Sequence, residues 1–339
     1  MIKAAYALLP LLFVMNATLS FSREYKVSGE IPIGGSGGWD YLTADSENHR
    51  LYVSHSTEVV VIDLDSQKIV GRISGMNRIH GIALADSLGS GFISDGGGNE
   101  VVVFKLKDLS IQKKIKAGTN PDGIVYDDVS KRVFAFNGKS QDATVIDATA
   151  GTVMGTIKLG GKPEFPVSDG KGSIYVNVED KNEIVHIDSR NLTAKEHWSI
   201  SPCESPSGLA MDKANRRLFS VCDGKVMTIT DADSGKVVAT PAIGDGPDAA
   251  AFDGEDKLAF SSNGDGTLTV IKETGKDTYS VAGTITTARG ARTMALDEKT
   301  HKIYLPTASF GPAPQATTTN PHPRPSIQPG TFKILVLAR

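Results

Sequence analysis

Seven positions of the chain carry polar residues at intervals of 40 to 44 residues, and together they could form a ligand-binding ring. They are Asp40, His80, Asp122, Glu164, Ser207, Asp248 and Arg292. Hard divalent cations prefer carboxylate oxygens, and crowded carboxylates raise one another's pKa values. If the fold gathers these positions, they predict a rim that binds a cationic or polyhydroxylated ligand or a metal. The candidate metal ligands are Asp40, Asp122, Glu164 and Asp248.

A repeat of about 42 residues must position this ring. The same short pattern ends five residues after each ring position, at an aspartate in six of the seven copies. A polar turn follows, then a β-rich run such as 51–53, a third run such as 59–63 and a fourth such as 68–73. No segment sustains a 3.6-residue period. Four strands in about 42 residues is the period of a β-propeller blade.

The predicted fold is therefore all-β: a single seven-bladed β-propeller over residues 23–339, with four antiparallel strands per blade. The seventh copy is incomplete, because a long insert at 309–330 follows its second strand and the chain ends after a third strand at 332–337. We expect residues 25–33 to supply the missing fourth strand and to close the ring, which removes exposed sheet edges.

Residues 1–22 read as a secretory signal peptide. Lys3 is the only charge before Arg23, residues 4–14 are apolar apart from Pro10, and Ser20 and Ser22 suit a signal peptidase. The apolar run is shorter than the ~20 residues of a spanning helix, so we expect cleavage at about Ser22/Arg23 rather than an uncleaved anchor. The predicted location is periplasmic or secreted, with no transmembrane segment in the mature chain.

Composition excludes several classes of protein. Charged residues make up 22% of the chain and hydrophobic residues 40%, which is too apolar for a disordered protein. The formal net charge of −3 leaves no basic footprint for duplex nucleic acid. Two cysteines cannot form a disulfide scaffold, but Cys203 and Cys222 should lie near one rim and are a candidate disulfide outside the cytoplasm.

Two further groups are expected at the rim that carries the ring. The second strand of each blade should end there, at His55, Asp95, Asn137, Val178, Cys222, Ser262 and Thr307. We take five of these residues, His55, Asp95, Asn137, Cys222 and Thr307, as a second ring. The proline-rich insert should lie on the same rim as a strap beside the channel mouth, with His322 and Arg324 as its reactive groups; a mobile surface loop is the alternative.

The repeat resembles a known family. Leu51-Tyr52-Val53-Ser54, residues 59–63 and Lys68-Ile69-Val70 look like the YVTN-type repeat, and residues 25–337 resemble the YncE-like seven-bladed propellers of bacterial envelopes. The resemblance implies an extracytoplasmic protein and supplies no catalytic motif. Related propellers include lactonases and the haem or copper domains of redox enzymes, so the resemblance leaves an enzyme open.

The preferred function is a non-catalytic extracytoplasmic propeller that binds a small molecule or an envelope protein at the polar rim, and we expect a monomer. The first alternative is a metal-dependent, lactonase-like hydrolase that uses the rim carboxylates. The second is a purely structural or interaction propeller. No catalytic residue and no organic cofactor is predicted, and a divalent metal is the one cofactor that the rim carboxylates suggest.

Overall fold

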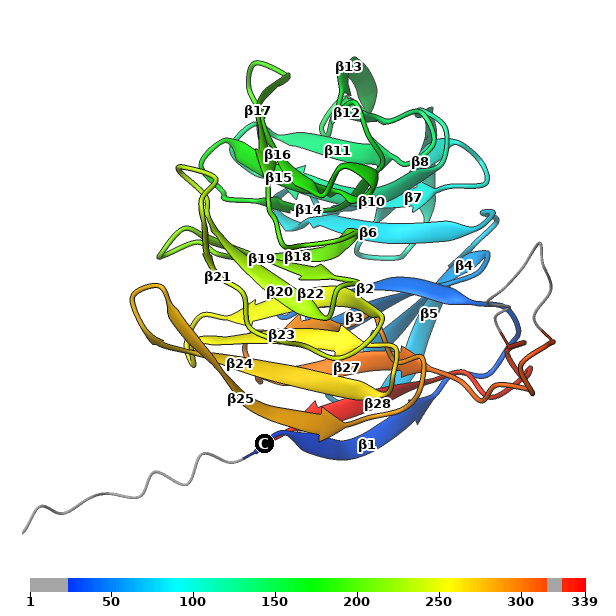
Figure 1. The fold of residues 1–339 in the computed structure, drawn as a ribbon. Coiled ribbons are helices and arrows are strands. Elements are labelled where there is room, and N and C mark those ends of the chain that lie inside the picture. The colour runs from blue at the N-terminus through cyan, green and yellow to red at the C-terminus, as the bar shows by residue number, and fades with distance from the viewer. Residues whose placement is uncertain (1–23, 316–324) are drawn as a thin grey trace, which may run out of the picture.

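The computed structural model describes residues 24–315 and 325–339, and these residues form seven four-stranded antiparallel sheets arranged as the blades of a ring (Figure 1). We number the blades in chain order, starting with the sheet β2-β3-β4-β5. The prediction of a seven-bladed, all-β propeller is confirmed. Two single-turn 3-10 helices, η1 (Asp86–Leu88) and η2 (Glu179–Lys181), are the helices of the described residues.

Each blade contributes one strand to each of four layers. The innermost strands are β2 (Trp39–Asp45), β6 (Ile79–Ala85), β10 (Pro121–Asp127), β14 (Pro163–Ser168), β18 (Pro206–Asp212), β22 (Pro247–Asp253) and β26 (Ala295–Asp297). The second strands are β3 (Arg50–His55), β7 (Ser90–Asp95), β11 (Arg132–Asn137), β15 (Ser173–Val178), β19 (Arg217–Cys222), β23 (Leu258–Asn263) and β27 (Lys302–Thr307). The third strands are β4 (Glu58–Asp63), β8 (Glu100–Lys105), β12 (Asp142–Asp147), β16 (Glu183–Asp188), β20 (Val226–Asp231), β24 (Thr267–Gly275) and β28 (Lys333–Ala338). The outermost strands are β5 (Lys68–Ser74), β9 (Ile111–Lys116), β13 (Thr152–Lys158), β17 (Thr193–Ser199), β21 (Val237–Ala239), β25 (Thr278–Thr286) and β1 (Lys26–Pro32).

The two ends of the chain close the ring. Strand β1 pairs antiparallel with β28, from Lys26 opposite Ala338 to Pro32 opposite Lys333. The seventh blade therefore has the strand order β26-β27-β28-β1, and Figure 1 shows β1, coloured blue, beside β28, coloured red. The expected closure of the propeller by the N-terminal strand is confirmed.

The aspartate that ends most innermost strands shapes the following turn. Asp45 accepts the backbone N–H of Asn48, Asp127 accepts that of Ser130, and Asp212 accepts that of Ala214. Asp127 is fully buried, as expected for a side chain that replaces backbone partners within a turn. This local hydrogen bonding explains why aspartate recurs at the end of the repeated pattern.

The insert of blade seven begins after β27 and lies beside the glycine-rich segment 34–38. Its two described ends pair with each other, because Gly311 N–H donates to Ser326 O at 2.8 Å and Gln328 N–H donates to Ser309 O at 2.8 Å. Gly330 N–H donates to Gly35 O at 2.6 Å. His322 and Arg324, the predicted reactive groups of the strap, lie outside the described residues, as does the predicted signal peptide at 1–22.

The described residues contain no helix that is long and apolar enough to cross a membrane.

Candidate functional site

The predicted ring residues lie where the innermost strands begin, at one end of the propeller channel. Six of the seven are the second residue of their strand, and Arg292 lies three residues before β26. The structure brings them into two groups. We call Asp40, His80, Asp122 and Glu164, from blades one to four, the acidic arc. We call Ser207, Asp248 and Arg292, from blades five to seven, the opposite arc.

His80 is the centre of the acidic arc. Its Nδ1 lies 2.5 Å from Asp40 Oδ2 and 3.6 Å from Asp122 Oδ1, and the residue is 6% exposed. Burial disfavours the imidazolium ion, but the hydrogen bond with Asp40 and the charges of Asp122 and Asp40 outweigh it and raise the pKa of His80. His80 therefore donates from Nδ1 to Asp40 and stands between two carboxylates.

The next two carboxyl groups of the arc retain protons to unusually high pH. Burial raises the pKa of Asp122 to about 6, although His80 opposes the shift. Burial and the charge of Asp122 raise the pKa of Glu164 to about 8. Lys162 Nζ lies 2.7 Å from Glu164 and favours its ionised form, but this ammonium group also contacts Glu179. One shared lysine does not offset the burial of Glu164, so the arc holds more carboxyl groups than its cations compensate.

Hydrogen bonds between blades fix the main chain of the rim. Ser94 Oγ donates to Asp122 O at 2.5 Å, Asn177 Nδ2 to Ser207 O at 3.0 Å, and Thr293 Oγ1 to Asp40 O at 2.9 Å. Ser262 Oγ contacts Arg292 O in the same way. Four of the ring positions are thus held through their backbone carbonyl groups, so these contacts do not use their side chains. The sequence analysis did not predict these hydrogen bonds between blades. A signal for them exists, because Ser94, Asn177 and Ser262 each lie one residue before the end of a second strand.

The residues predicted as a second ring are buried and do not share the face of the sheet that carries the first ring. His55 is 3% exposed, Asp95 1%, Asn137 0%, Cys222 0% and Thr307 1%. The register explains this, because His55 pairs with Trp39 and Asp95 with Ile79, each one residue before a ring position. Side chains alternate along a strand, so these residues do not share the ring's side of the sheet. Blade six also differs at its end, since β23 ends at Asn263 rather than Ser262.

The buried second-ring residues hold neighbouring loops instead. Asp95 accepts the backbone N–H groups of Asn77 and Gly98, and Thr307 donates to Arg289 O. Asn137 donates to Asp142 and Thr144, and the His55 ring stacks on Phe332 with centroids 4.5 Å apart. Cys222 forms a disulfide with Cys203, with Cα atoms 5.4 Å apart. These contacts are structural, although His55 Nε2 and Asn137 Oδ1 are buried without a hydrogen-bond partner among the described residues.

Two aromatic rings meet across the channel directly below the ring residues. Tyr41 of blade one and Phe165 of blade four have centroids 4.9 Å apart at an interplanar angle of 63°. The equivalent residues of the other blades are small: Gly81, Gly123, Gly208, Ala249 and Thr293. Burial, together with the charges of Asp122, Glu164, Asp40 and Asp248, raises the pKa of Tyr41 well above its ordinary value. Its phenol is therefore neutral and lies beneath the carboxyl groups of the ring. In the sequence, the only signal for this contact is that Tyr41 and Phe165 are large where the other copies of the repeat have small residues.

A cavity lies along the innermost strands on the far side of the Tyr41 and Phe165 side chains from the ring residues. Its volume is about 610 Å³, and its walls include Leu84, Val167, Met211, Phe252 and Leu296. None of the seven ring residues lines it. Its lining also includes charged residues such as Asp45, Lys213 and Glu298, so the channel has the polar ring at one end and a cavity of mixed polar and apolar lining at the other.

The acidic arc contains a group of atoms that could hold a metal ion. One ligand atom each from Asp40, His80 and Asp122 lies within 4.8 Å of the others. Carboxylates with an imidazole suit several divalent metals. A similar group, Asp253, Asp256 and His301, lies elsewhere. There the Arg339 guanidinium contacts Asp256 and lies 3.6 Å from Asp253, so a protein cation already occupies that position.

Comparisons with known proteins support the fold alone. The chain matches no protein-family model and no curated protein sequence. It is similar in structure to Kuenenia stuttgartiensis hydrazine synthase, at 16% identity and a TM-score of 0.70, over 80% of this chain and 92% of that chain. It is also similar to U3-55K, at 6% identity and a TM-score of 0.75, over 91% of this chain and 97% of that chain. Such low identities carry no function from one protein to another.

Proposed function

We propose that this protein is a non-catalytic, extracytoplasmic propeller of the YncE-like type that binds a small cationic ligand, or a cationic group of an envelope protein, at its acidic arc. The main observation behind this proposal is that three acidic residues, Asp40, Asp122 and Glu164, lie around only two basic residues. These are His80 and Lys162, and Lys162 also contacts another carboxylate. A bound cation would compensate the carboxylates that the protein itself leaves partly uncompensated.

The chemistry of the rim favours binding over catalysis. His80 Nδ1 is engaged by Asp40, and Ser207 Oγ donates to the carbonyl of Pro247 rather than to a base. Among the described ring residues, no hydroxyl or thiol pairs with a general base, as nucleophilic catalysis requires.

Two observations support an extracytoplasmic location. The N-terminal 22 residues have the composition of a signal peptide, and the protein contains the disulfide Cys203–Cys222. Disulfides persist mainly in oxidising compartments. Mass spectrometry of the N-terminus of protein recovered from the cell envelope tests this part of the proposal, and an intact Met1 in cytoplasmic protein would contradict it.

Calorimetry of purified residues 23–339 with Ca²⁺, Mn²⁺, Zn²⁺, choline and spermidine tests the binding site. We expect at least one of these cations to bind wild-type protein and to raise its melting temperature. Asp122→Asn should weaken that binding at least tenfold. Asp248→Asn is the matched control, because it removes a carboxylate at the same repeat position in the opposite arc, and it should weaken binding less than threefold. Equal effects of the two variants, or no binding by any cation, would refute the site.

A metal-dependent hydrolase of lactones is the second candidate, and the Asp40–His80–Asp122 group favours it. In that case these three residues would hold a divalent metal, which would supply a polarised water. Stoichiometric metal retained after desalting, together with lactone hydrolysis that is lost on chelation, would favour the enzyme. Cation binding by chelator-treated protein without any hydrolysis would favour the binding propeller.

A further inference from the structure

The outermost strands of neighbouring blades are complementary in size to the turns that cover them. A Cβ atom added at Gly71 of β5 would overlap Leu109, which lies in the turn before β9 of the next blade. A Cβ atom added at Gly155 of β13 would lie 3.5 Å from Leu192 in the turn before β17. In both pairs of blades, a leucine from the turn fills a recess that a glycine leaves on the preceding blade.

The opposite combination, a glycine in the turn and a large side chain on the outermost strand, occurs at two other pairs of blades. Gly151, in the turn before β13, faces Lys113 of the preceding blade, and Gly235, in the turn before β21, faces Trp198. All four turn residues have positive φ, and the two leucines have values of 63° and 58°. A leucine is unfavourable in this backbone region, so its use at two of the turns indicates that filling the recess compensates for the strain.

Gly283 of β25 in blade six forms a third recess of this kind. It pairs with Val270 just before a β-bulge, as Gly71 pairs with Val61 and Gly155 with Val145. A Cβ atom added at Gly283 would meet nothing within 4 Å. Among the described residues, no turn of blade seven covers this recess, because its third strand β28 and its outermost strand β1 come from different parts of the chain and are not joined by a turn.

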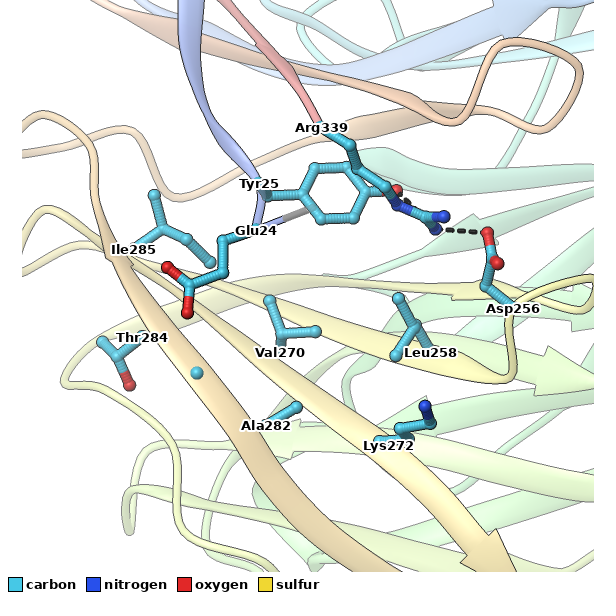
Figure 2. A pocket seen from close by; sticks show the side chains of 11 residues that line it. Glu24, Tyr25, Asp256, Leu258, Val270, Lys272, Ala282, Thr284, Ile285 and Arg339 are labelled. Atoms are coloured by element: carbon cyan, nitrogen blue, oxygen red, sulfur yellow. Dashed lines mark hydrogen bonds and ion pairs between the residues drawn. The ribbon is translucent and has the colours of Figure 1, made fainter. Parts of the chain in front are cut away.

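Tyr25 occupies the place of the missing turn but leaves the recess open. Its ring packs edge-on against Phe260 with centroids 5.2 Å apart, and its hydroxyl donates to His301 O at 2.9 Å. A pocket of about 320 Å³ remains, lined by Gly283 and by Leu258, Val270 and Ile285. Figure 2 shows these apolar side chains below Tyr25, with Glu24 and Lys272 beside them. A cavity of this volume is within the range of small-ligand sites.

The charges around the pocket are of two kinds. Arg339 is compensated, since its guanidinium contacts Asp256 and lies 3.6 Å from Asp253 (Figure 2). The side chains of Glu24 and Lys272 form no hydrogen bond or ion pair with any residue in the described ranges, 24–315 and 325–339, although the backbone of Lys272 takes part in the sheet. Among the described residues, the pocket therefore combines an apolar recess with one carboxylate and one ammonium group that no other side chain engages.

We propose that this pocket binds a small zwitterion with a leucine-sized aliphatic group, that is, a free aliphatic amino acid. The aliphatic group fills the recess at Gly283, as Leu109 and Leu192 fill the equivalent recesses. The ammonium group pairs with Glu24 and the carboxylate pairs with Lys272. This site is separate from the acidic arc and does not depend on the function proposed for it.

Calorimetry with four probes tests the ligand class. L-leucine should bind wild-type protein, and glycine, which lacks the aliphatic group, should not. The analogues 4-methylpentanoate and 3-methylbutylamine each keep the aliphatic group but only one charge, and each should bind at least fivefold more weakly than L-leucine. Absence of L-leucine binding, or equal binding of either analogue, would overturn the proposal. Binding of an N-acetylated Asp-Leu-Ser amide without binding of free leucine would also overturn it, because the recess would then serve a polypeptide.

Matched glycine variants test the position of the site. Gly283→Leu should fill the recess, keep the melting temperature at or above that of wild type, and reduce L-leucine binding at least tenfold. Lys272→Gln should weaken binding without changing the melting temperature. Gly155→Ala is the control, because its recess is already filled and it should leave binding unchanged. If Gly283→Leu bound L-leucine with wild-type affinity, the site would be refuted. If Gly155→Ala also lost L-leucine binding, the assignment of the site to blade six would be refuted.

Discussion

The two halves of the channel rim differ in how their charges are compensated, although their residues come from one repeat position. In the acidic arc, three carboxyl groups share His80 and part of Lys162, and the side chains of Asp122 and Glu164 are only 13% and 12% exposed. In the opposite arc, Ser207 Oγ donates to a backbone carbonyl, and Arg292 Nη1 lies 3.2 Å from Asp248 Oδ2.

This difference shows that the repeat determines where a side chain lies but not what it can bind. The opposite arc satisfies its own hydrogen bonds and charges, and the nearby disulfide Cys203–Cys222 holds its first blade. The acidic arc keeps an excess of carboxyl groups beside neutral Tyr41. Four measurements can sharpen or break this comparison.

Removal of the disulfide should have the largest effect on stability. The double substitution Cys203→Ser and Cys222→Ser opens a loop with a sequence separation of 19 residues. Such a loop corresponds to about 3 kcal/mol of unfolding free energy. Urea denaturation measures this loss, and wild-type protein under reducing conditions should match the variant. Cation binding at the acidic arc should stay within twofold of wild type. A loss below 1 kcal/mol would show that the disulfide does not stabilise the opposite arc.

Removal of the acidic arc's central cation should have the next largest effect. His80→Gln leaves Asp40 and Asp122 without the imidazolium between them, and we expect a loss of about 2 kcal/mol at pH 7. A double-mutant cycle with Asp40→Asn checks the cause by urea denaturation. The double variant should lose at least 1 kcal/mol less than the sum of the single variants. Additive losses would mean that His80 and Asp40 do not compensate each other.

The pH dependence of stability should report Glu164. Its pKa of about 8 in the folded protein is above its ordinary value, so the folded state binds a proton more tightly than the unfolded state does. Its contribution is complete below about pH 4.5 and is lost as the pH rises toward 8. Glu164→Gln should therefore flatten the fall in stability between pH 5 and 8 and should be more stable than wild type at pH 8. Parallel pH profiles for the two proteins would contradict this.

The smallest effect is expected in the opposite arc. Arg292→Gln removes an ion pair with Asp248 whose arginine side chain is 41% exposed. Such pairs contribute about 0.5 kcal/mol or less because water and salt screen them. Thermal unfolding at low and high salt measures this. A loss above 2 kcal/mol would show that the opposite arc, like the acidic arc, depends on buried charge.

The sequence alone determined the architecture of this protein. Its period of about 42 residues predicts seven blades, and the incomplete seventh copy predicts closure by residues 25–33, because a strand without a partner would leave an open edge. It also predicts the ring positions, since one repeat position lies at one place on every blade. The recurrent aspartate at the end of the pattern acts within its own turn, so it too is visible as a local signal.

Only the tertiary structure decided which ring residues form ion pairs with one another and which side chains face the channel. The residues predicted as a second ring, such as His55 and Asp95, pair with residues one position before the ring, and a difference of one residue places a side chain on the other face of the sheet. The compensation of Asp248 and the burial of Asp122 depend on neighbouring blades. The contact of Tyr41 with Phe165 and the open recess at Gly283 arise between segments far apart in the chain, where no local pattern records the distance.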